Sequence, residues 1–407
     1  MKLKSIIYFL FLFSFALAME KRELPAMVVT PKKVKALLSE ELKIVPSLIN
    51  LINKLKEGDQ LEINSFVLTN KNLIDALIEA KQRGVELRVI VDKQSYKIDH
   101  KLLQKLAENG IPVYIFRGDI TNHLKTVIWS YRNDQGEILY RVAQGSTNLT
   151  HLAEYNWEHT TIIPSDKEIY DIFKNLNDHL VKNSDLLYGQ KSIFPGKRKV
   201  ESQEEEVLKK QKITLESTPK KVTAIGSLTH DLSDSIKKFI ERSDAGTSIS
   251  ISTYTYNDFD FTKTLINALK RGVKIKLIID GATLHNRNAR IQSYINSQLL
   301  DLTKEGAEIF VFNPNQTELL FKKYPIKAHR KVITIDRPDK KIVIEGSGNF
   351  TYLEAINAFV IHPGNLEIFN TFKRANEHLL EESVPYEFIL YSQKLKEQES
   401  ARRQIKF

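Results

Sequence analysis

The sequence predicts an α/β fold made of two similar units, each a mixed sheet with helices on its faces. Residues 73–92 and 264–280 share one pattern, an amphipathic helix followed by a glycine and a β-branched strand. Residues 102–116 and 299–312 repeat helix, glycine and strand once more. Because helices and strands alternate in both copies, we expect parallel strands within each unit.

The two copies keep a constant register. A shift of 188 residues places Gly84 over Gly272 and Asp92 over Asp280. Each glycine is expected to end its helix, and each aspartate comes directly after a strand. We expect Asp92 and Asp280 to cap the loop that follows, rather than to act in catalysis.

Composition limits the chemistry. The chain has 407 residues, 42% of them hydrophobic and 27% charged, which is typical of two or three compact domains. It contains no cysteine, which excludes disulfides, thiolate nucleophiles, iron–sulfur clusters and cysteine-based zinc sites. A net charge of +10 favours anionic partners such as nucleic acid or acidic phospholipid.

Residues 1–18 are predicted to be a secretory signal peptide. Two lysines precede an apolar run that ends in Ala16-Leu17-Ala18, a small-residue cleavage site. The alternative is an uncleaved anchor, but the run is shorter than the ~20 residues that span a bilayer. Cleavage would remove Lys2 and Lys4, reduce the net charge from +10 to +8, and leave a secreted or periplasmic protein.

The rest of the chain divides into four segments. Residues 35–190 and 223–386 are the predicted halves, and residues 191–222 form a charged linker with almost no apolar periodicity. The basic run at 197–199 also fits a nuclear-localisation signal, which the signal peptide contradicts. Residues 387–407 are a polar tail, expected to be a frayed helix.

Two histidines stand out among ten. His123 and His329 each lie two residues before a lysine, Lys125 or Lys331, that leads into an apolar strand. In a strand, residues i and i+2 project from one face, so both side chains can address one bound anion. The other eight histidines are expected to be structural.

A second small polar motif follows each histidine–lysine pair. It reads Gly-Ser-Thr-Asn at 145–148 and Gly-Ser-Gly-Asn at 346–349. Its hydroxyl and amide groups can donate to phosphate oxygens. The expected phosphate-binding residues are therefore Lys125, Lys331, Ser146, Asn148, Ser347 and Asn349.

These residue types suit phosphodiester hydrolysis. Displacement at phosphorus needs a nucleophile, a proton donor for the leaving oxygen and positive charge near the other oxygens. Imidazole can attack or donate near neutral pH, and the lysines supply the charge. No cluster of Asp and His has metal-ligand spacing, so we expect no metal and no cofactor.

At these residues the chain resembles the phospholipase D superfamily, whose motifs are H-x-K-x4-D and G-S-x-N. The second half matches in full, with His329, Lys331 and Asp336, whereas Ser130 replaces the aspartate in the first. Glu158 fills an N-x-E segment after the first G-S-x-N, and Phe359 stands at that sequence position in the second.

The resemblance implies one active site at a pseudo-twofold interface and a phosphohistidine intermediate. His123 is then the nucleophile, oriented by Glu158, and His329 is the general acid. Glu158 could instead pair with a core lysine. Asp336 belongs to the family's catalytic motif, although a structural role is favoured for it here.

Three aromatic residues, Trp129, Trp157 and Tyr254, could line a substrate groove, but aromatic residues near strands are more often part of the core.

Three functions remain open at this stage. A phospholipase D is placed first, by resemblance to phospholipases and cardiolipin hydrolases. An exported endonuclease that cleaves DNA or RNA is the alternative, favoured by basic charge. A non-catalytic lipid- or nucleic-acid-binding protein is the third, and it rests on Ser130 and Phe359. The expected partners are an anionic phosphodiester and a membrane surface contacted peripherally, and the chain is expected to be a monomer because it holds both motifs.

Overall fold

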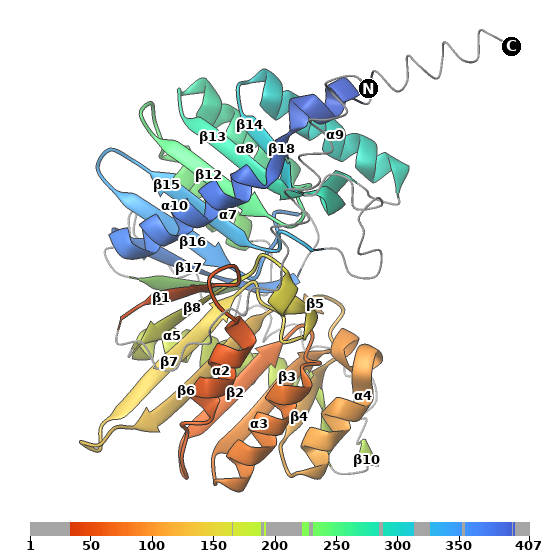
Figure 1. The fold of residues 1–407 in the computed structure, drawn as a ribbon, viewed down its shortest axis with the longest axis vertical. Coiled ribbons are helices and arrows are strands. Elements are labelled where there is room, and N and C mark those ends of the chain that lie inside the picture. Colours follow the sequence, from red (N-terminus) through yellow and green to blue (C-terminus); the bar gives the residue numbers. More distant parts are fainter. Residues whose placement is uncertain are drawn as a thin grey trace, which may run out of the picture.

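The computed structural model describes residues 33–164, 166–188, 191–192, 222–227, 231–284, 288–312, 326–351, 355–392 and 394. Two sheets of similar topology lie one above the other in Figure 1, the first half in red to yellow and the second in green to blue.

The first sheet has nine strands in the order β1-β8-β7-β6-β2-β3-β4-β9-β10. Their bounds, in chain order, are β1 Lys35–Leu38, β2 Gln60–Ser65, β3 Glu86–Asp92, β4 Val113–Phe116, β6 Lys125–Arg132, β7 Ile138–Gly145, β8 His159–Pro164, β9 Ser184–Tyr188 and β10 Lys191–Ser192.

The second sheet repeats this arrangement in the order β11-β17-β16-β15-β12-β13-β14-β18. The bounds are β11 Thr223–Ser227, β12 Ser248–Thr253, β13 Lys274–Asp280, β14 Glu308–Phe312, β15 Lys331–Asp336, β16 Lys341–Gly346, β17 Ala355–Pro363 and β18 Ser383–Pro385. The short strand β5 (Thr121–Asn122) of the first half pairs with β17 of the second.

Both sheets are mixed, as the sequence predicts. Strands β2, β3 and β4 are parallel, and so are β12, β13 and β14. The strand that begins at the lysine of each histidine–lysine motif is antiparallel to its neighbour: β6 pairs with β2, and β15 pairs with β12.

Helices cover both faces of each sheet. Residues of α2, α3 and α4 share one apolar core with the first sheet, and α5 packs on the opposite face. In the second half α7, α8 and α9 share one apolar core with the second sheet, and α10 packs on its opposite face. The bounds are α2 Ile44–Ile52, α3 Lys71–Gln82, α4 Lys93–Glu108, α5 Lys167–Lys182, α7 Asp231–Glu241, α8 Phe259–Lys270, α9 Ala289–Lys304 and α10 Leu366–Glu381, with short 3-10 helices η1 Leu152–Tyr155 and η2 Gly281–Leu284.

Local signals explain the helix ends. Asn70 accepts a hydrogen bond from Leu73 N at the start of α3, and Asp258 accepts one from Phe261 N at the start of α8. Gly84 and Gly272 follow these helices with φ of 88° and 86°. This left-handed conformation favours glycine, so the predicted helix stops are confirmed.

The two halves meet through symmetry-related contacts. Helix α5 packs against β11 of the second half, and α10 packs against β1 of the first. One apolar cluster joins Phe173 of α5 to Ala358 and Val360 of β17, and another joins Leu38 of β1 to Phe372 of α10. Shared burial of this kind fixes how the halves face each other.

Parts of the predicted organisation lie outside the described residues, namely the signal peptide at 1–18 and most of the linker at 191–222. Strand β10 pairs with β9, so the first sheet extends two residues into the segment predicted as linker. The described start of the predicted tail, residues 387–392, is helical. Among the described helices, none combines the length and the apolar character needed to cross a membrane.

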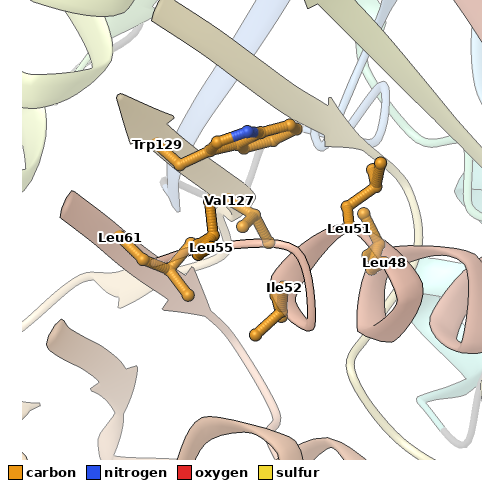
Figure 2. A pocket seen from close by; sticks show the side chains of 7 residues that line it. All are labelled: Leu48, Leu51, Ile52, Leu55, Leu61, Val127 and Trp129. Carbon is orange, nitrogen blue, oxygen red and sulfur yellow. The ribbon is translucent and has the colours of Figure 1, made fainter. Parts of the chain in front are cut away.

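A small pocket lies between α2 and the first sheet (Figure 2), and its seven lining side chains are hydrophobic. Trp129 is one of them and is only 4% exposed. This hollow belongs to the core, so Trp129 does not line a substrate groove.

Candidate active site

The two histidine–lysine motifs sit at the starts of β6 and β15. Lys125 Nζ donates to His123 O over 2.6 Å, and Lys331 Nζ donates to His329 O over 2.5 Å. The side chains of both lysines are almost completely buried. Each lysine is thereby fixed beside its own histidine, in line with the expectation that the pair addresses one anion.

The strand-end aspartates hold the segments that precede the histidines. Asp92 accepts hydrogen bonds from Gln94 N (2.8 Å) and Asn122 N (2.9 Å). Asp280 accepts from Ala282 N and Ala328 N, both at 2.8 Å. The predicted capping role is confirmed, and each carboxylate also anchors the backbone next to a histidine.

The glycines of the two G-S-x-N motifs are needed for close backbone contact. A Cβ atom on Gly145 would lie 2.3 Å from His159 O, and one on Gly346 would lie 2.2 Å from Ala358 O. Larger residues would push apart β7 and β8 or β16 and β17. The serines that follow are thereby held beside the neighbouring strands.

The hydrogen bonds of the two histidines run crosswise between the halves. His329 Nδ1 lies 2.9 Å from Glu158 Oε2, although Glu158 belongs to the first half. Ser146 Oγ donates to the same carboxylate oxygen over 2.6 Å. The expectation that Glu158 orients His123 is therefore wrong, because this carboxylate is bonded to the other histidine.

His123 has an amide partner in place of a carboxylate. Its Nδ1 lies 3.1 Å from Asn357 Oδ1, and Ser347 Oγ donates to that oxygen over 3.2 Å. Asn357 Nδ2 donates to Ala355 O, which keeps Oδ1 turned toward the imidazole. Because an amide oxygen only accepts, His123 carries its proton on Nδ1.

Asn357, not Phe359, is the structural counterpart of Glu158. Gly145 pairs with Thr160 and Gly346 pairs with Phe359, so the connection is 15 residues long in the first half and 13 in the second. Counting from the glycine therefore misaligns the second half by two residues. Phe359 faces the apolar core and replaces no catalytic acid.

Asp336 lies outside the site. It ends β15 opposite Ser248 and pairs with Lys341. Five residues of extended strand separate it from Lys331, about 16 Å. Its inclusion among the catalytic residues is therefore wrong, and Ser130, at the same place in β6, removes nothing from the site.

The G-S-x-N asparagines are half-buried with unused acceptor atoms. Asn148 Oδ1 and Asn349 Oδ1 have no hydrogen-bond partner within the described residues. Both side chains follow serines that are bonded to the histidine partners, so they stand next to the site.

Burial and mutual charge set the electrostatics. Burial lowers the pKa of His123 and of His329 well below the usual value, and Lys125 and Lys331 lower both further. Both imidazoles are therefore neutral at pH 7. A phosphodiester anion between the lysines would raise the pKa of both histidines and allow one ring to become imidazolium.

Glu158 and Lys331 titrate in the same range. Burial raises the pKa of Glu158 to about 7, opposed by Lys331, and lowers the pKa of Lys331 to about 7, opposed by Glu158. Burial also lowers the pKa of Lys125 well below its usual value, and Lys331 adds to this effect. These couplings across the halves show that the two motifs form one site.

Besides Asn357, three side chains at the site were missed or left open from sequence. Phe66 lies 5.1 Å from His123 and Tyr254 lies 4.9 Å from His329, ring centre to ring centre. The 188-residue shift places Phe66 over Tyr254, a signal that could have found the pair. Lys327 Nζ lies 5.3 Å from the centre of the Tyr254 ring. Trp157, in contrast, packs against Phe312 and His378.

The fold and the site together define a two-part phospholipase D-like protein, in which the halves of one chain contribute to a single candidate site. The chain belongs to the family described as cardiolipin synthase, PLD-like domain, which matches residues 48–180 and 236–358. It is thus a member of the phospholipase D superfamily of phosphodiesterases, and the resemblance seen in the motifs is confirmed.

Individual relatives are distant. The chain is 35% identical over 104 residues to proteins named phospholipase D from Rickettsia felis and Rickettsia typhi, which is 26% of this chain and 42% and 41% of theirs. It therefore spans about two fifths of the length of these curated relatives. A polyphosphate kinase from Porphyromonas gingivalis has a TM-score of 0.55 at 14% identity, over 90% of this chain and 55% of that chain, and shares the fold.

Proposed function

We propose that this protein is a phospholipase D that hydrolyses the head-group phosphodiester of phospholipids through a phosphohistidine, without a metal. The crosswise pairing carries the proposal: each histidine is held at Nδ1 by the opposite half, which leaves Nε2 as the reacting nitrogen. The partial similarity to proteins named phospholipase D supports the lipid substrate.

The two partners divide the roles. An ionised Glu158 stabilises positive charge that develops on His329 when its Nε2 bonds to phosphorus, so His329 is the better nucleophile. The neutral amide of Asn357 gives no such stabilisation, so a protonated His123 is the stronger acid. This assignment reverses the roles expected from sequence.

The reaction proceeds in two displacements. His329 Nε2 attacks phosphorus, the bond to the head-group oxygen breaks, and that oxygen takes the proton from His123 Nε2. Neutral His123 then removes a proton from water, whose oxygen attacks the phosphohistidine, and the bond to His329 breaks. Lys125 and Lys331 stabilise the equatorial phosphoryl oxygens in both steps, assisted by the amides of Asn148 and Asn349.

A substrate panel in chelator tests the proposal. Protein lacking residues 1–18 is incubated in the presence of EDTA with each substrate in turn: phospholipids, plasmid DNA and single-stranded DNA. We expect phosphatidic acid and free head group from the lipids. Activity lost in EDTA and restored by a divalent ion would contradict the metal-free mechanism.

An endonuclease is the second candidate. The net charge of +10 favours it, since lysines that neutralise backbone phosphates bind nucleic acid in a strongly salt-dependent way. Cleavage of DNA, with lipids intact and affinity falling steeply with salt, would establish this function in place of the first.

The proposal includes an exported, monomeric enzyme. The apolar N-terminal run with its small-residue site supports export to the periplasm or the medium. Both histidines lie in one chain, which supports a monomer. N-terminal sequencing of the exported protein and its mass in solution test these points.

A further inference from the structure

Residues 150–157 form a turn that joins the two halves of the site. The turn starts after Asn148 and ends at Trp157, which donates from its backbone N to Lys327 O over 2.8 Å. His329 N donates to Trp157 O over 3.0 Å, and Lys327 N donates to Asn156 Oδ1 over 3.2 Å. The turn is therefore fixed beside the nucleophile.

This turn exposes apolar side chains next to a charged site. Within η1, Leu152 is 40% exposed and Tyr155 is 52% exposed, while Ala153 between them is buried. Residues i and i+3 of a 3-10 helix lie on the same side, so Leu152 and Tyr155 form one apolar tip. The ring of His151 lies edge-on to Tyr155, with ring centres 5.6 Å apart.

A cation accompanies the tip. Lys327 follows the turn in space, is half-buried, and places its ammonium over the Tyr254 ring, with no carboxylate partner among the described residues. Glu154 is the one carboxylate among residues 150–157, and the chain as a whole carries +10. An apolar tip beside a lysine matches the interface of an anionic bilayer, where acyl chains lie beneath negative head groups.

We propose that Leu152 and Tyr155 insert into an anionic phospholipid surface, with Lys327 at head-group level, and so bring the site to its substrate. This inference rests on the proposed phospholipase function and adds the surface by which the enzyme meets lipid. A nucleic-acid strand is a poorer fit, because bases stack on aromatic rings and Leu152 offers none.

Vesicle binding tests the inference separately from catalysis. Co-sedimentation with phosphatidylglycerol–phosphatidylcholine vesicles is measured for the unmodified chain and for Leu152→Ser/Tyr155→Ser. We expect partitioning to fall about tenfold, since apolar contact with the acyl region is lost. Lys327→Gln should reduce the preference for phosphatidylglycerol over pure phosphatidylcholine.

The matched control replaces two apolar side chains of comparable exposure elsewhere on the surface. Ile138 (45% exposed) begins β7 and Leu366 (59% exposed) begins α10, both at the sheet ends opposite the histidines. Ile138→Ser/Leu366→Ser should bind vesicles like the unmodified chain. Leu152→Phe, which adds apolar area, should bind more tightly.

Three results would overturn the inference: unchanged vesicle binding by the Leu152/Tyr155 variant, equal loss in the control, or loss of single-stranded DNA binding in Tyr155→Ser with lipid binding intact. Hydrolysis of soluble bis(p-nitrophenyl) phosphate is measured in parallel. If that reaction fails, the proposed function fails, while the vesicle result still decides the docking surface.

Discussion

Glu158 and Asn357 set the chemical difference between the two halves. They occupy the same place in the repeat, each bonded to a serine of its own half and a histidine of the other. A carboxylate can stabilise an imidazolium, whereas an amide can only fix its tautomer. In the proposed mechanism this one difference between the halves separates the nucleophile from the acid.

Trapping the intermediate tests this assignment. Bis(p-nitrophenyl) phosphate has a leaving group that needs no protonation, so His123→Ala should still form the adduct but hydrolyse it slowly. We expect a stoichiometric burst of p-nitrophenol, with the phosphoryl group on the His329 peptide after acid-quenched mapping. His329→Ala should show no burst and lose activity by at least about 10³-fold. An adduct on His123 would reverse the roles.

The pH profile should report Glu158 and Lys331. Glu158 must be ionised and Lys331 charged, and both have a pKa of about 7. We expect kcat/KM to rise with pH through the acid limb, pass a maximum near neutrality and fall above it. Glu158→Gln should lower the maximum by about 10²–10⁴-fold.

In Glu158→Gln the pH profile of kcat/KM should lose its acid limb and keep its alkaline limb, because only the carboxylate has been removed. Lys331→Gln is the matched control and should keep the acid limb. An unchanged acid limb in Glu158→Gln would rule out Glu158 as the titrating group.

At the scale of elements, β6 and β15 each begin at the site and end outside it. Their first residues, Lys125 and Lys331, are buried beside the histidines, whereas Ser130 and Asp336 lie five residues further along. The motif aspartate therefore belongs to the far end of a strand. The non-catalytic hypothesis loses its support, since neither Ser130 nor Phe359 replaces a site residue.

Asp336→Ser should leave activity within about twofold, because the strand places it about 16 Å from Lys331. Its ion pair with Lys341 is about one-third exposed, so stability should change by less than about 1 kcal/mol. Steady-state kinetics and a thermal melt check both expectations. Lys331→Ala on the same strand is the control that should lose activity, and equal losses in both variants would place Asp336 in the mechanism.

For the whole molecule, the pseudo-twofold interface carries a buried polar network beneath the site. Gln144 and Glu345, which precede the two glycines of the G-S-x-N motifs, meet over 2.6 Å. Equivalent residues can touch only near the twofold axis. His159 and His362 each place Nε2 3.0 Å from the Glu345 carboxylate.

This network should make the protein acid-labile. Hydrogen bonds from the two histidines lower the pKa of Glu345 against the opposing effect of burial, and burial lowers the pKa of His159. The unfolded chain takes up these protons at higher pH than the folded one, so stability falls as pH drops below about 6.5 and further through the carboxyl range.

Glu345→Gln should reduce the free energy of unfolding by about 1.5–3 kcal/mol at pH 7, since it weakens three bonds to a buried charge. Glu308→Gln is the control: Glu308 is exposed and pairs with Lys276, so its change should stay within about 0.5 kcal/mol. Denaturant unfolding between pH 5 and pH 8 measures both. A stability that is independent of pH would contradict the role given to the network.

The sequence by itself determined the repeat, the mixed α/β architecture and the two histidine–lysine pairs. These features are local: apolar periodicity, a glycine stop and motifs a few residues long are all legible along the chain. The 188-residue shift also aligns Phe66 with Tyr254, so the sequence contained the information needed to find this pair.

Only the tertiary structure decided which partner serves which histidine. Glu158 reaches His329 across 171 residues and Asn357 reaches His123 across 234, from opposite halves. Two extra residues in one connection also hid their equivalence. Such contacts depend on how two apolar interfaces pack, and no local pattern encodes that packing.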